Sequence, residues 1–472
     1  MPRLPRLLLC SAVFVLSQPT LAQDRDATIL SDDVTLGTDF GFEDDLFAAP
    51  FEESADQEAN WWDDFTFRLT QQLSGQINNH SIDLAPGITL PRESELETNR
   101  LGINVRYQNP FAPGWLLQGS AQSRIYWPED YEYKANNDHI ETESRVNELF
   151  VQRSFATQSL KFGRQTVVWG ETVGNSVLDV INHVEFRDFT IIDIEDARLN
   201  QWMLVWDYFG DDNSSRFSTF LNLYPEFNPA PVRGSPLFFD PGYNLPDYDR
   251  DNDVILEIGT QWRRSFAGSD IALMAAYLYE NQLRYEPPLP GEADATPDIN
   301  DFLLLGFSAN RAIGNWLLNF DLAYSHNVLA DSFAFPGTSG LSQPSSVRRD
   351  QLGTSFGFEY AINNEQSVSL GVQAQKFVDS DNNPASVSSD EVLGSWLLRY
   401  SNNLRNGDLV LSSTLQGDLD ANSLLAMFGA DYTLNDNWSV NAQIIAIAAS
   451  DDSPLLLFAD DLRLGLTLAY AF

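Results

Sequence analysis

Cysteine is nearly absent from this 472-residue chain, which has only Cys10. A single cysteine implies no disulfide framework. Beyond the first 22 residues there is also no run of about eighteen apolar residues, the length of a membrane-spanning helix. Basic residues are few as well, 28 against 67 acidic ones, for a formal net charge of −39. This balance excludes nucleic acid as a partner, because binding it needs clustered Lys and Arg.

Histidine is scarce, and the four in the chain are His80, His139, His183 and His326. None lies near a Gly-x-Ser-x-Gly pattern, Walker and dinucleotide-binding fingerprints are absent, and the His spacing does not suit zinc. An acidic stretch starts like a calcium loop but lacks the required Gly and final Glu; its residues are Asp247, Asp249, Asp251 and Asp253. We therefore expect no catalytic residue, no metal site and no cofactor, with divalent cations meeting only the acidic loops.

The first 22 residues have the pattern of a secretory signal peptide. Arg3 and Arg6 precede an apolar stretch from Leu7 to Leu16, and small residues precede Gln23. Residues 23–60 follow, and from position 24 they hold twelve Asp or Glu against one Arg without any period. This composition predicts a mobile acidic tail on the periplasmic side, with a segment tucked into a barrel mouth as the alternative.

From residue 61 to 472 the chain alternates apolar and polar residues in many short runs, which is the pattern of β-strands with two different faces. About eighteen such runs can be counted, with sixteen as the alternative. The runs are 63–75, 97–108, 115–127, 141–155, 158–169, 200–209, 215–224, 253–265, 269–284, 301–312, 315–327, 348–361, 365–378, 389–401, 406–416, 422–433, 436–449 and 460–472.

The connections between these runs alternate in length. Even-numbered runs end in compact turns such as Ala267-Gly268, Ile313-Gly314 and Asn435-Asp436, whereas most odd-numbered runs lead into long polar stretches. Bacterial membrane barrels show this alternation and have an even number of strands. The sequence therefore predicts a transmembrane antiparallel β-barrel with long external loops.

The two faces of each run predict lipid outside and water inside. On 315–327, for example, Trp316, Phe320 and Tyr324 fall on one face while Asn319 and Asp321 fall on the other. A dry interior would leave such polar groups unpaired at a cost of a few kcal/mol each. Tryptophans mark the expected membrane interfaces; they are Trp115, Trp316 and Trp438 after short turns, and Trp127 and Trp169 near the opposite ends.

The last strand carries a family resemblance. Its ending, Leu-Ala-Tyr-Ala-Phe, resembles the C-terminal strand of Gram-negative outer-membrane barrels, whose terminal Phe is read by the barrel-assembly machinery. The resemblance implies an outer-membrane location, contact with outer-membrane lipids, and recognition of Phe472 by that machinery. The sequence does not fix the oligomeric state, because trimer contacts and lipid contacts are both apolar.

One connection, 170–198, is too apolar for a loop exposed to water, and we expect it to fold into the lumen. Its carboxylates would then face arginines of the wall, and opposed charges across a constriction orient and filter solutes. The alternative is an external lid. The constriction and lumen candidates are Arg100, Arg106, Arg164, Glu171, Asp179, Glu185, Arg187, Asp188, Asp193 and Arg198.

The same region holds a motif, Gly-Arg-Gln-x-Val-x-Trp-Gly-Glu followed by Leu-Asp-Val-Ile-Asn. It resembles a signature of a large Gram-negative outer-membrane family of unknown function, a resemblance that implies transport of hydrophobic or lipid-like compounds. In that family Pro usually follows the Asn, whereas His183 stands there in this chain. The motif positions are Gly163, Arg164, Trp169, Gly170, Glu171 and Asn182.

At eighteen strands a barrel leaves an aqueous channel. We therefore expect a non-enzymatic channel for passive passage of small solutes, with selectivity set by the inward loop and the charged wall. A transporter of hydrophobic compounds is the first alternative. A barrel-borne enzyme or surface-interaction protein is the second.

Overall fold

A computed structural model describes residues 64–472 apart from several short segments. Those segments are 86–87, 173–175, 186–197, 211–213, 230–234, 236–237, 239–241, 250–253, 287, 290, 330–347, 379–391, 421, 452 and 454. The signal peptide predicted at 1–22 and the acidic tail predicted at 23–60 lie outside the described residues.

Within the described residues, eighteen strands form one antiparallel sheet. The strands are β1 (Phe65–Gln76), β4 (Glu95–Ala112), β5 (Trp115–Tyr126), β6 (Glu141–Ser154), β7 (Gln158–Gln165), β8 (Gln201–Phe209), β9 (Ser215–Tyr224), β10 (Glu257–Phe266), β11 (Ser269–Tyr279), β14 (Asp301–Ile313), β15 (Trp316–Leu329), β16 (Arg348–Ala361), β17 (Gln366–Phe377), β18 (Leu393–Leu404), β19 (Leu409–Asp418), β20 (Ser423–Thr433), β21 (Trp438–Ala449) and β22 (Leu462–Ala471). The predicted fold class is confirmed, with eighteen strands rather than sixteen.

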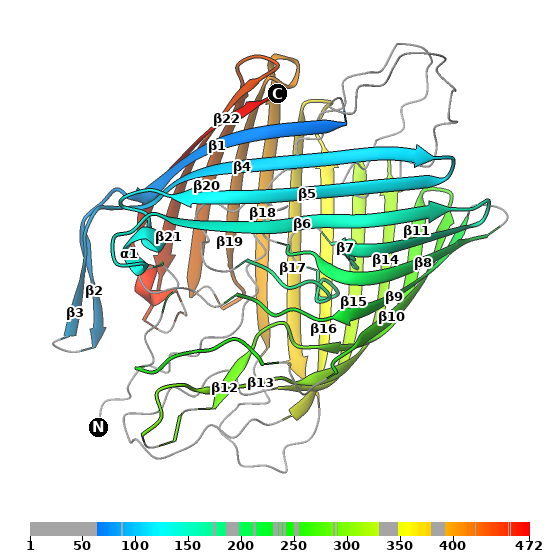
Figure 1. Ribbon diagram of the computed structural model, residues 1–472, viewed down its shortest axis with the longest axis horizontal. Coiled ribbons are helices and arrows are strands. Elements are labelled where there is room, and N and C mark those ends of the chain that lie inside the picture. Colours follow the sequence, from blue (N-terminus) through cyan, green and yellow to red (C-terminus); the bar gives the residue numbers. More distant parts are fainter. Residues whose placement is uncertain are drawn as a thin grey trace.

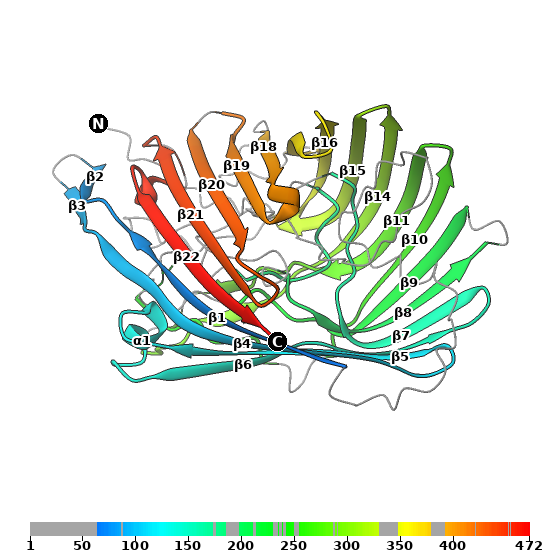
Figure 2. The ribbon, with the colours of Figure 1, turned by 90° about the horizontal axis from the view of Figure 1, so that it is seen from above.

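The sheet closes into a cylinder because β1 pairs with both its neighbour β4 and the last strand, β22. Leu69 lies opposite Ile103 of β4 and opposite Tyr470 of β22. The other strands follow one another around the wall in chain order, and blue β1 lies beside red β22 in Figures 1 and 2. Closure pairs the strand edges, which is required of a sheet that crosses a membrane.

The smaller elements lie in the connections between barrel strands. Two are hairpins, β2 (His80–Ala85) with β3 (Ile88–Arg92) and β12 (Arg284–Glu286) with β13 (Thr296–Asp298). The others are helix α1 (Tyr131–Ala135) and the 3₁₀ turns η2 (Arg405–Gly407) and η3 (Leu456–Phe458). No helix in the described part of the chain is long and apolar enough to cross a membrane.

The two rims of the barrel differ in their connections. The rim that holds the start of β1 and the end of β22 has tight turns, and three of them contain a glycine with a φ of +59° to +72°: Gly114, Gly268 and Gly314. Such a conformation strains any residue with a Cβ. Bacterial barrels keep short turns on the periplasmic side, so we name this the periplasmic rim and the opposite one the outer rim. The outer rim carries the long connections, except for residues 419–422 between β19 and β20.

The outward face of the cylinder is apolar and exposed. On β22, Leu464, Leu466 and Leu468 are 40–44% exposed and alternate with side chains that point inward. Aromatic pairs follow the turns of the periplasmic rim, with ring centroids 4.4 Å apart for Trp316 and Tyr360 and 4.8 Å apart for Trp438 and Tyr470. An exposed apolar band edged by aromatic rings is the surface that a lipid bilayer covers.

Trp169 does not belong to these interfacial aromatics, so its prediction as an interface marker is wrong. The strand expected at 158–169 ends at Gln165, and beyond that residue the chain turns inward. Trp169 is 4% exposed and packs edge-on against Phe220, with ring centroids 5.5 Å apart. The strand ends four residues before the predicted end at Trp169. The ring was therefore assigned to the membrane interface, although it lies inside the barrel.

Two neighbouring residues in the middle of β17 test the assignment of faces. Val372 pairs with Phe356 on the lipid side, while Gln373 pairs with Ser355 on the lumen side. We expect Val372→Arg to lower the free energy of unfolding by about 2–4 kcal/mol, because it places a charge in lipid. Gln373→Arg should change it by about 1 kcal/mol, the value of its hydrogen bond to Ser395. Urea titration of protein folded into vesicles measures both, and equal losses would contradict the assignment.

Candidate functional site

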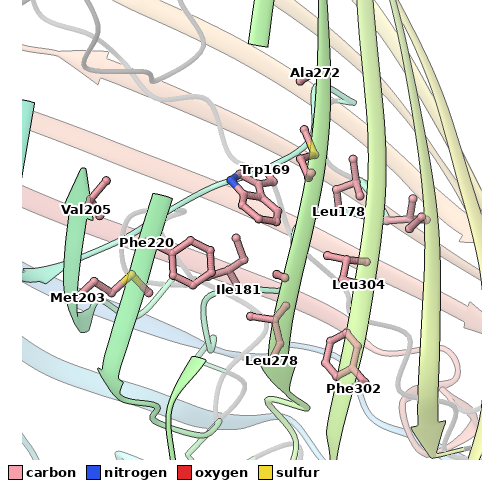
Figure 3. Close-up of a cluster of buried hydrophobic side chains, with 14 residues drawn as sticks. Trp169, Leu178, Ile181, Met203, Val205, Phe220, Ala272, Leu278, Phe302 and Leu304 are labelled. Atoms are coloured by element: carbon pink, nitrogen blue, oxygen red, sulfur yellow. The ribbon is translucent and has the colours of Figure 1, made fainter. Parts of the chain in front are cut away.

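The connection between β7 and β8 lies inside the barrel, and we name its described residues 166–172, 176–185 and 198–200 the inner loop. Apolar side chains of this loop pack on inward-facing residues of the wall (Figure 3). Trp169, Leu178 and Ile181 are at most 4% exposed. The wall side of the cluster comprises Met203, Val205, Phe220, Ala272, Met274, Ala276, Leu278, Phe302, Leu304 and Ala323, from β8 to β15.

Glycines on the inner wall make room for these loop side chains. A Cβ added at Gly259 of β10 would lie 2.8 Å from the Trp169 ring, and one at Gly306 of β14 would lie 2.6 Å from Leu178 Cδ2. On β16, a Cβ at Gly353 would come within 3.1 Å of Val177. These distances are shorter than ordinary packing contacts, so a side chain at any of these three glycines would crowd the inner loop.

The buried carboxylate of Asp321 fixes the tip of the inner loop, around Glu171 and Thr172. Asp321 of β15 is 0% exposed and accepts hydrogen bonds from the backbone N–H groups of Glu171 and Thr172, at 3.1 and 3.0 Å. The Ser176 hydroxyl donates a further bond to it at 2.8 Å. Nearby, the Val177 N–H donates to Ser355 Oγ of β16 at 2.9 Å. These bonds give buried polar groups of both the wall and the loop their partners, so they fix the position of the loop tip.

Gly170 permits the turn at this tip. Its φ is +102°, and a Cβ there would lie 1.9 Å from Ser176 Oγ. Gly163 of β7 has a φ of +142°, and a Cβ there would lie 2.1 Å from the Leu149 carbonyl oxygen of β6. Both motif glycines therefore stand where backbone geometry and space exclude a side chain.

Side-chain amides hold the part of the inner loop around Val167, Val180 and Asn182. Asn182 accepts from the Val167 N–H at 3.1 Å and donates to the Val167 carbonyl at 2.8 Å, which ties the two limbs of the loop together. Asn281 donates to the carbonyls of Val180 and Asn182, both at 2.9 Å. Amides bonded to backbone groups in this way give the polar backbone of an inward loop the partners that water would otherwise supply.

Charged residues gather around the lumen towards the periplasmic rim. Glu171 at the loop tip contacts Arg263 of β10 and accepts from Asn310 of β14 at 3.1 Å, while Arg263 also lies 3.5 Å from Asp270 of β11. On β8 and β9, Asp207 and Arg216 form an ion pair at 3.2 Å.

The opposite wall continues this arrangement. Arg399 of β18 interacts electrostatically with Glu359 of β16 and Asp431 of β20, and Asp431 interacts with Arg68 of β1. Arg106 of β4 shares this level of the wall, since it pairs with Thr66 near the start of β1. We name this set the charge belt: Arg68, Arg106, Glu171, Asp207, Arg216, Arg263, Asp270, Glu359, Arg399 and Asp431.

Two of the wall arginines predicted to face the inner loop, Arg100 and Arg164, bind carboxylates of other segments within the described part of the chain. Arg100 is buried, binds Asp130 at 3.0 Å and stacks on Tyr126 and Tyr131 near the outer rim. Burial raises the pKa of the Asp130 carboxyl, and the Arg100 charge opposes that rise. Arg164 forms two bonds to Glu226, at 2.6 and 2.7 Å. Both lie in the outer half of their strands, within reach of acidic residues of the external connections.

The remaining predicted residues lie in or beside the inner loop. Arg198 binds Asp179 at 2.9 Å within the loop, and Glu185 lies 3.7 Å from Arg145 of β6. Arg187, Asp188 and Asp193 fall outside the described residues. The sequence placed Asp321 on the inward face but did not identify either Asp321 or Arg263 as a partner of the inner loop, because alternation does not show which inward side chain contacts a loop.

The histidines do not converge on one another. His80 Nε2 lies 3.3 Å from Asp461, His183 Nε2 lies 3.4 Å from Glu226, and His326 Nδ1 lies 2.6 Å from Asp350. These three histidines therefore lie beside three different carboxylates at the outer end of the barrel. Among the described residues, no group of three or more His, Cys, Asp or Glu side chains is arranged to hold a metal ion.

Comparison with known proteins supports this architecture. A family model described as a protein of unknown function (DUF1302) matches residues 28–241, which include the motif positions 163–182. No curated protein matches the chain. Among solved structures, OccAB1 of Acinetobacter baumannii is 10% identical with a TM-score of 0.50, and the match covers 89% of this chain and 99% of that one.

Two structures from Pseudomonas aeruginosa are also similar. OccK8 (OprE) is 10% identical with a TM-score of 0.49, covering 86% of this chain and 97% of its own. The outer membrane protein opdK is 10% identical with a TM-score of 0.47, covering 87% and 99%. At these identities the likeness concerns the fold alone. A closed barrel with an exposed apolar band resides in the outer membrane of a Gram-negative cell.

We expect the space at Gly306 to be required for the inner loop to stay docked. Gly306→Leu forces a side chain onto Leu178, and such overpacking costs about 1–3 kcal/mol. We expect a cysteine placed at Thr172, which is 6% exposed, to react with a water-soluble maleimide roughly tenfold faster in this variant. Gly119→Leu is the control, because a Cβ there lies on the outer face at ordinary contact distances, 3.6 Å from Leu149 and 3.9 Å from the Glu148 carbonyl oxygen. Unchanged labelling in Gly306→Leu would show that this contact does not hold the loop.

Proposed function

We propose that the protein is a channel through which small polar solutes pass by diffusion, between the inner loop and the polar part of the barrel wall. The observation that carries this proposal is that the inner surface has two parts, an apolar part covered by the inner loop and an uncovered part. The apolar wall residues from β8 to β15 are covered by the inner loop and are at most 8% exposed. The surface that remains for a solute is therefore polar.

The uncovered wall supports the proposal strand by strand. Inward positions of β1, β4 and β5 include Thr70, Asn104 and Ser120, all partly exposed, and Arg106, which is exposed. On β17 to β20, the inward positions include Gln373, Ser401, Ser412 and Asp431, which are also partly exposed. Amide, hydroxyl and charged groups facing the same space replace part of a solute's hydration shell as it passes.

A transporter of hydrophobic compounds needs an accessible apolar track, and the described inner wall has two apolar patches. The inner loop covers the first. The second consists of Leu425, Met427, Ile445 and Ile447, and η3 covers it with Phe458. Because both patches are packed against the chain itself, the polar-solute channel is favoured over the hydrophobic alternative. The separate histidines favour neither an enzyme nor a metal-dependent activity.

The charge belt is the proposed selectivity element. Among the described residues it holds five arginines and five carboxyl groups. Opposite charges on facing walls produce a field across the passage that orients dipolar and zwitterionic solutes. The acidic surplus of the whole chain adds a mild preference for cations at the outer rim.

Release of the inner loop should widen the passage. Asp321→Ala removes the acceptor for three donors, and each buried donor left unsatisfied costs about 1–3 kcal/mol. We expect the single-channel conductance in planar bilayers to rise roughly twofold or more, as expected when the lumen of a wide barrel is opened. Ser325→Ala, on the same face of β15, is the control and should conduct like the parent protein.

The same recordings test the proposed function separately from the role of the loop. A current that is equal in the parent and Asp321→Ala would remove the loop as the constriction but leave the channel. No current from either protein, together with no uptake of small sugars or amino acids by proteoliposomes, would overturn the channel itself. Deletion of residues 172–196 provides a second variant, with an expected increase at least as large as that of Asp321→Ala.

Arg106 tests the charge belt. Arg106→Glu reverses a charge on the inner wall, and we expect the permeability ratio of K⁺ to Cl⁻ to rise by about twofold. Reversal potentials measured across a KCl gradient report this ratio. Arg264→Glu is the matched control, since Arg264 neighbours Arg263 on β10 but lies on the outer face. If both variants shift the ratio alike, then surface charge at the rim, rather than the belt, sets selectivity.

A further inference from the structure

Arginines are the only charged residues on the outward face of the described strands near the periplasmic rim. They are Arg153 of β6, Arg264 of β10 and Arg311 of β14. Their partners on neighbouring strands are apolar residues of the lipid side: Leu160, Ile271 and Leu318. The chain as a whole holds 67 acidic residues against 28 basic ones, so this set of arginines runs against the overall charge.

All three arginines lie at the level where lipid headgroups begin. Each stands two residues before an exposed apolar residue at the strand end, and these residues are Phe155, Phe266 and Ile313. Arg153 pairs with Trp115, and Ile313 pairs with Trp316, so the arginines share the level of the interfacial tryptophans. Such an aromatic girdle marks the boundary between hydrocarbon and headgroups. The guanidinium groups therefore face the headgroups of the periplasmic leaflet.

Arg264 and Arg311 form one surface. They flank β11, on which Arg264 is level with Ile271 and Arg311 is level with Ser269. Neighbouring strands lie about 4.8 Å apart and two residues span about 7 Å, so the two positions are separated by roughly 10 Å across the strands and roughly 7 Å along them. Both side chains are exposed. Two long side chains that approach from opposite sides of β11 can therefore meet at one anionic group between them.

Aromatic rings hold two of the three guanidinium groups at this level. Arg264 lies 5.6 Å from the ring centroid of Phe266, and Arg153 lies 5.1 Å from that of Trp115. Cation–π contact stabilises a guanidinium without neutralising its charge, and the N–H donors still project from the edge of its plane. Arg153 uses one donor on the Pro113 carbonyl at 2.6 Å. Within the part of the chain that the structure describes, Arg264 and Arg311 have no acceptor and no counterion, so their donors are available to a ligand.

The acidic surplus of the chain does not reach this surface. Asp270 of β11 points into the lumen, where it lies 3.5 Å from Arg263. On the outward face of β14 the carboxylate is Asp301, which lies ten residues from Arg311 and thus about 33 Å away along the strand. Exposed charges are largely screened beyond about 8 Å at physiological ionic strength. The local field is therefore that of two arginines, and it favours an anion.

We propose that Arg264 and Arg311 bind the phosphate of an anionic glycerophospholipid in the periplasmic leaflet. Arginine binds phosphate through two parallel hydrogen bonds, so two arginines suit one phosphate diester. A zwitterionic lipid would bring its ammonium group towards the same two cations. On the side of the bilayer centre, the acyl chains pack on a row of apolar side chains across three strands: Trp262, Leu273 and Phe307. The site faces away from the lumen and does not depend on conduction.

Fluorescence quenching beside the site tests this proposal on the full protein in phosphatidylcholine vesicles. Bimane is attached at Leu273→Cys on a Cys10→Ser background, and its quenching by nitroxide-labelled phosphatidylglycerol is compared with that by nitroxide-labelled phosphatidylcholine. An arginine near an anionic headgroup contributes about fivefold in affinity, so we expect a preference for phosphatidylglycerol of about tenfold or more. Bimane at Leu468→Cys, on the lipid face of β22, is the control position and should report a preference below about twofold.

Removal of the arginines should abolish this preference. Arg311→Gln should lower it about fivefold, and Arg264→Gln with Arg311→Gln should lower it to the value at Leu468→Cys. Lys376→Gln is the matched control, because it removes an exposed charge at the outer end of β17, beside Leu352 of the lipid face, and should keep the parent preference. An unchanged preference in the double variant, or equal preferences at both reporter positions, would overturn the site. Binding of isolated peptidoglycan that is lost in the double variant while the lipid preference stays would assign the arginines to that polymer instead.

Discussion

The bonds around the Asp321 carboxylate are the interaction on which the interior depends. A buried carboxylate is costly unless donors surround it, and here the donors come from the tip of the inner loop rather than from the wall. The loop and the wall therefore require each other: the loop backbone needs acceptors within the barrel, and Asp321 needs donors. The glycines at positions 259, 306 and 353 allow the close approach that makes these bonds short enough.

Because the inner loop covers one side of the barrel, the two sides of the inner surface differ in polarity. A barrel of eighteen strands has more inner wall than a solute passage needs, and the side from β8 to β15 is apolar because a loop covers it. The opposite side stays polar because water reaches it. The charge belt joins both sides, since Glu171 belongs to the loop while Arg399 and Asp431 belong to the uncovered wall. The proposed constriction and the proposed selectivity element thus have one structural origin.

The barrel was predictable from sequence because the two-residue alternation of apolar and polar side chains in a strand involves only neighbouring residues. Leu464, Leu466 and Leu468 reveal their shared face without knowledge of any partner. The position of the inner loop was not predictable to the same extent, because its contacts join residues about 150 positions apart, such as Glu171 and Asp321. Arg100 shows the same limit, since its partner Asp130 follows the next strand and no periodic pattern links the two. Composition marked the loop as buried, but only the structure supplies its partners.

The distance in sequence between the inner loop and its binding site also orders the assembly of the protein. Val177 bonds to Ser355, which comes 178 residues later, so the loop has no complete binding site until β15 and β16 have joined the sheet. Loop closure over such a separation costs entropy before the contact forms. The inner loop therefore reaches its docked position only once β15 and β16 have joined the sheet.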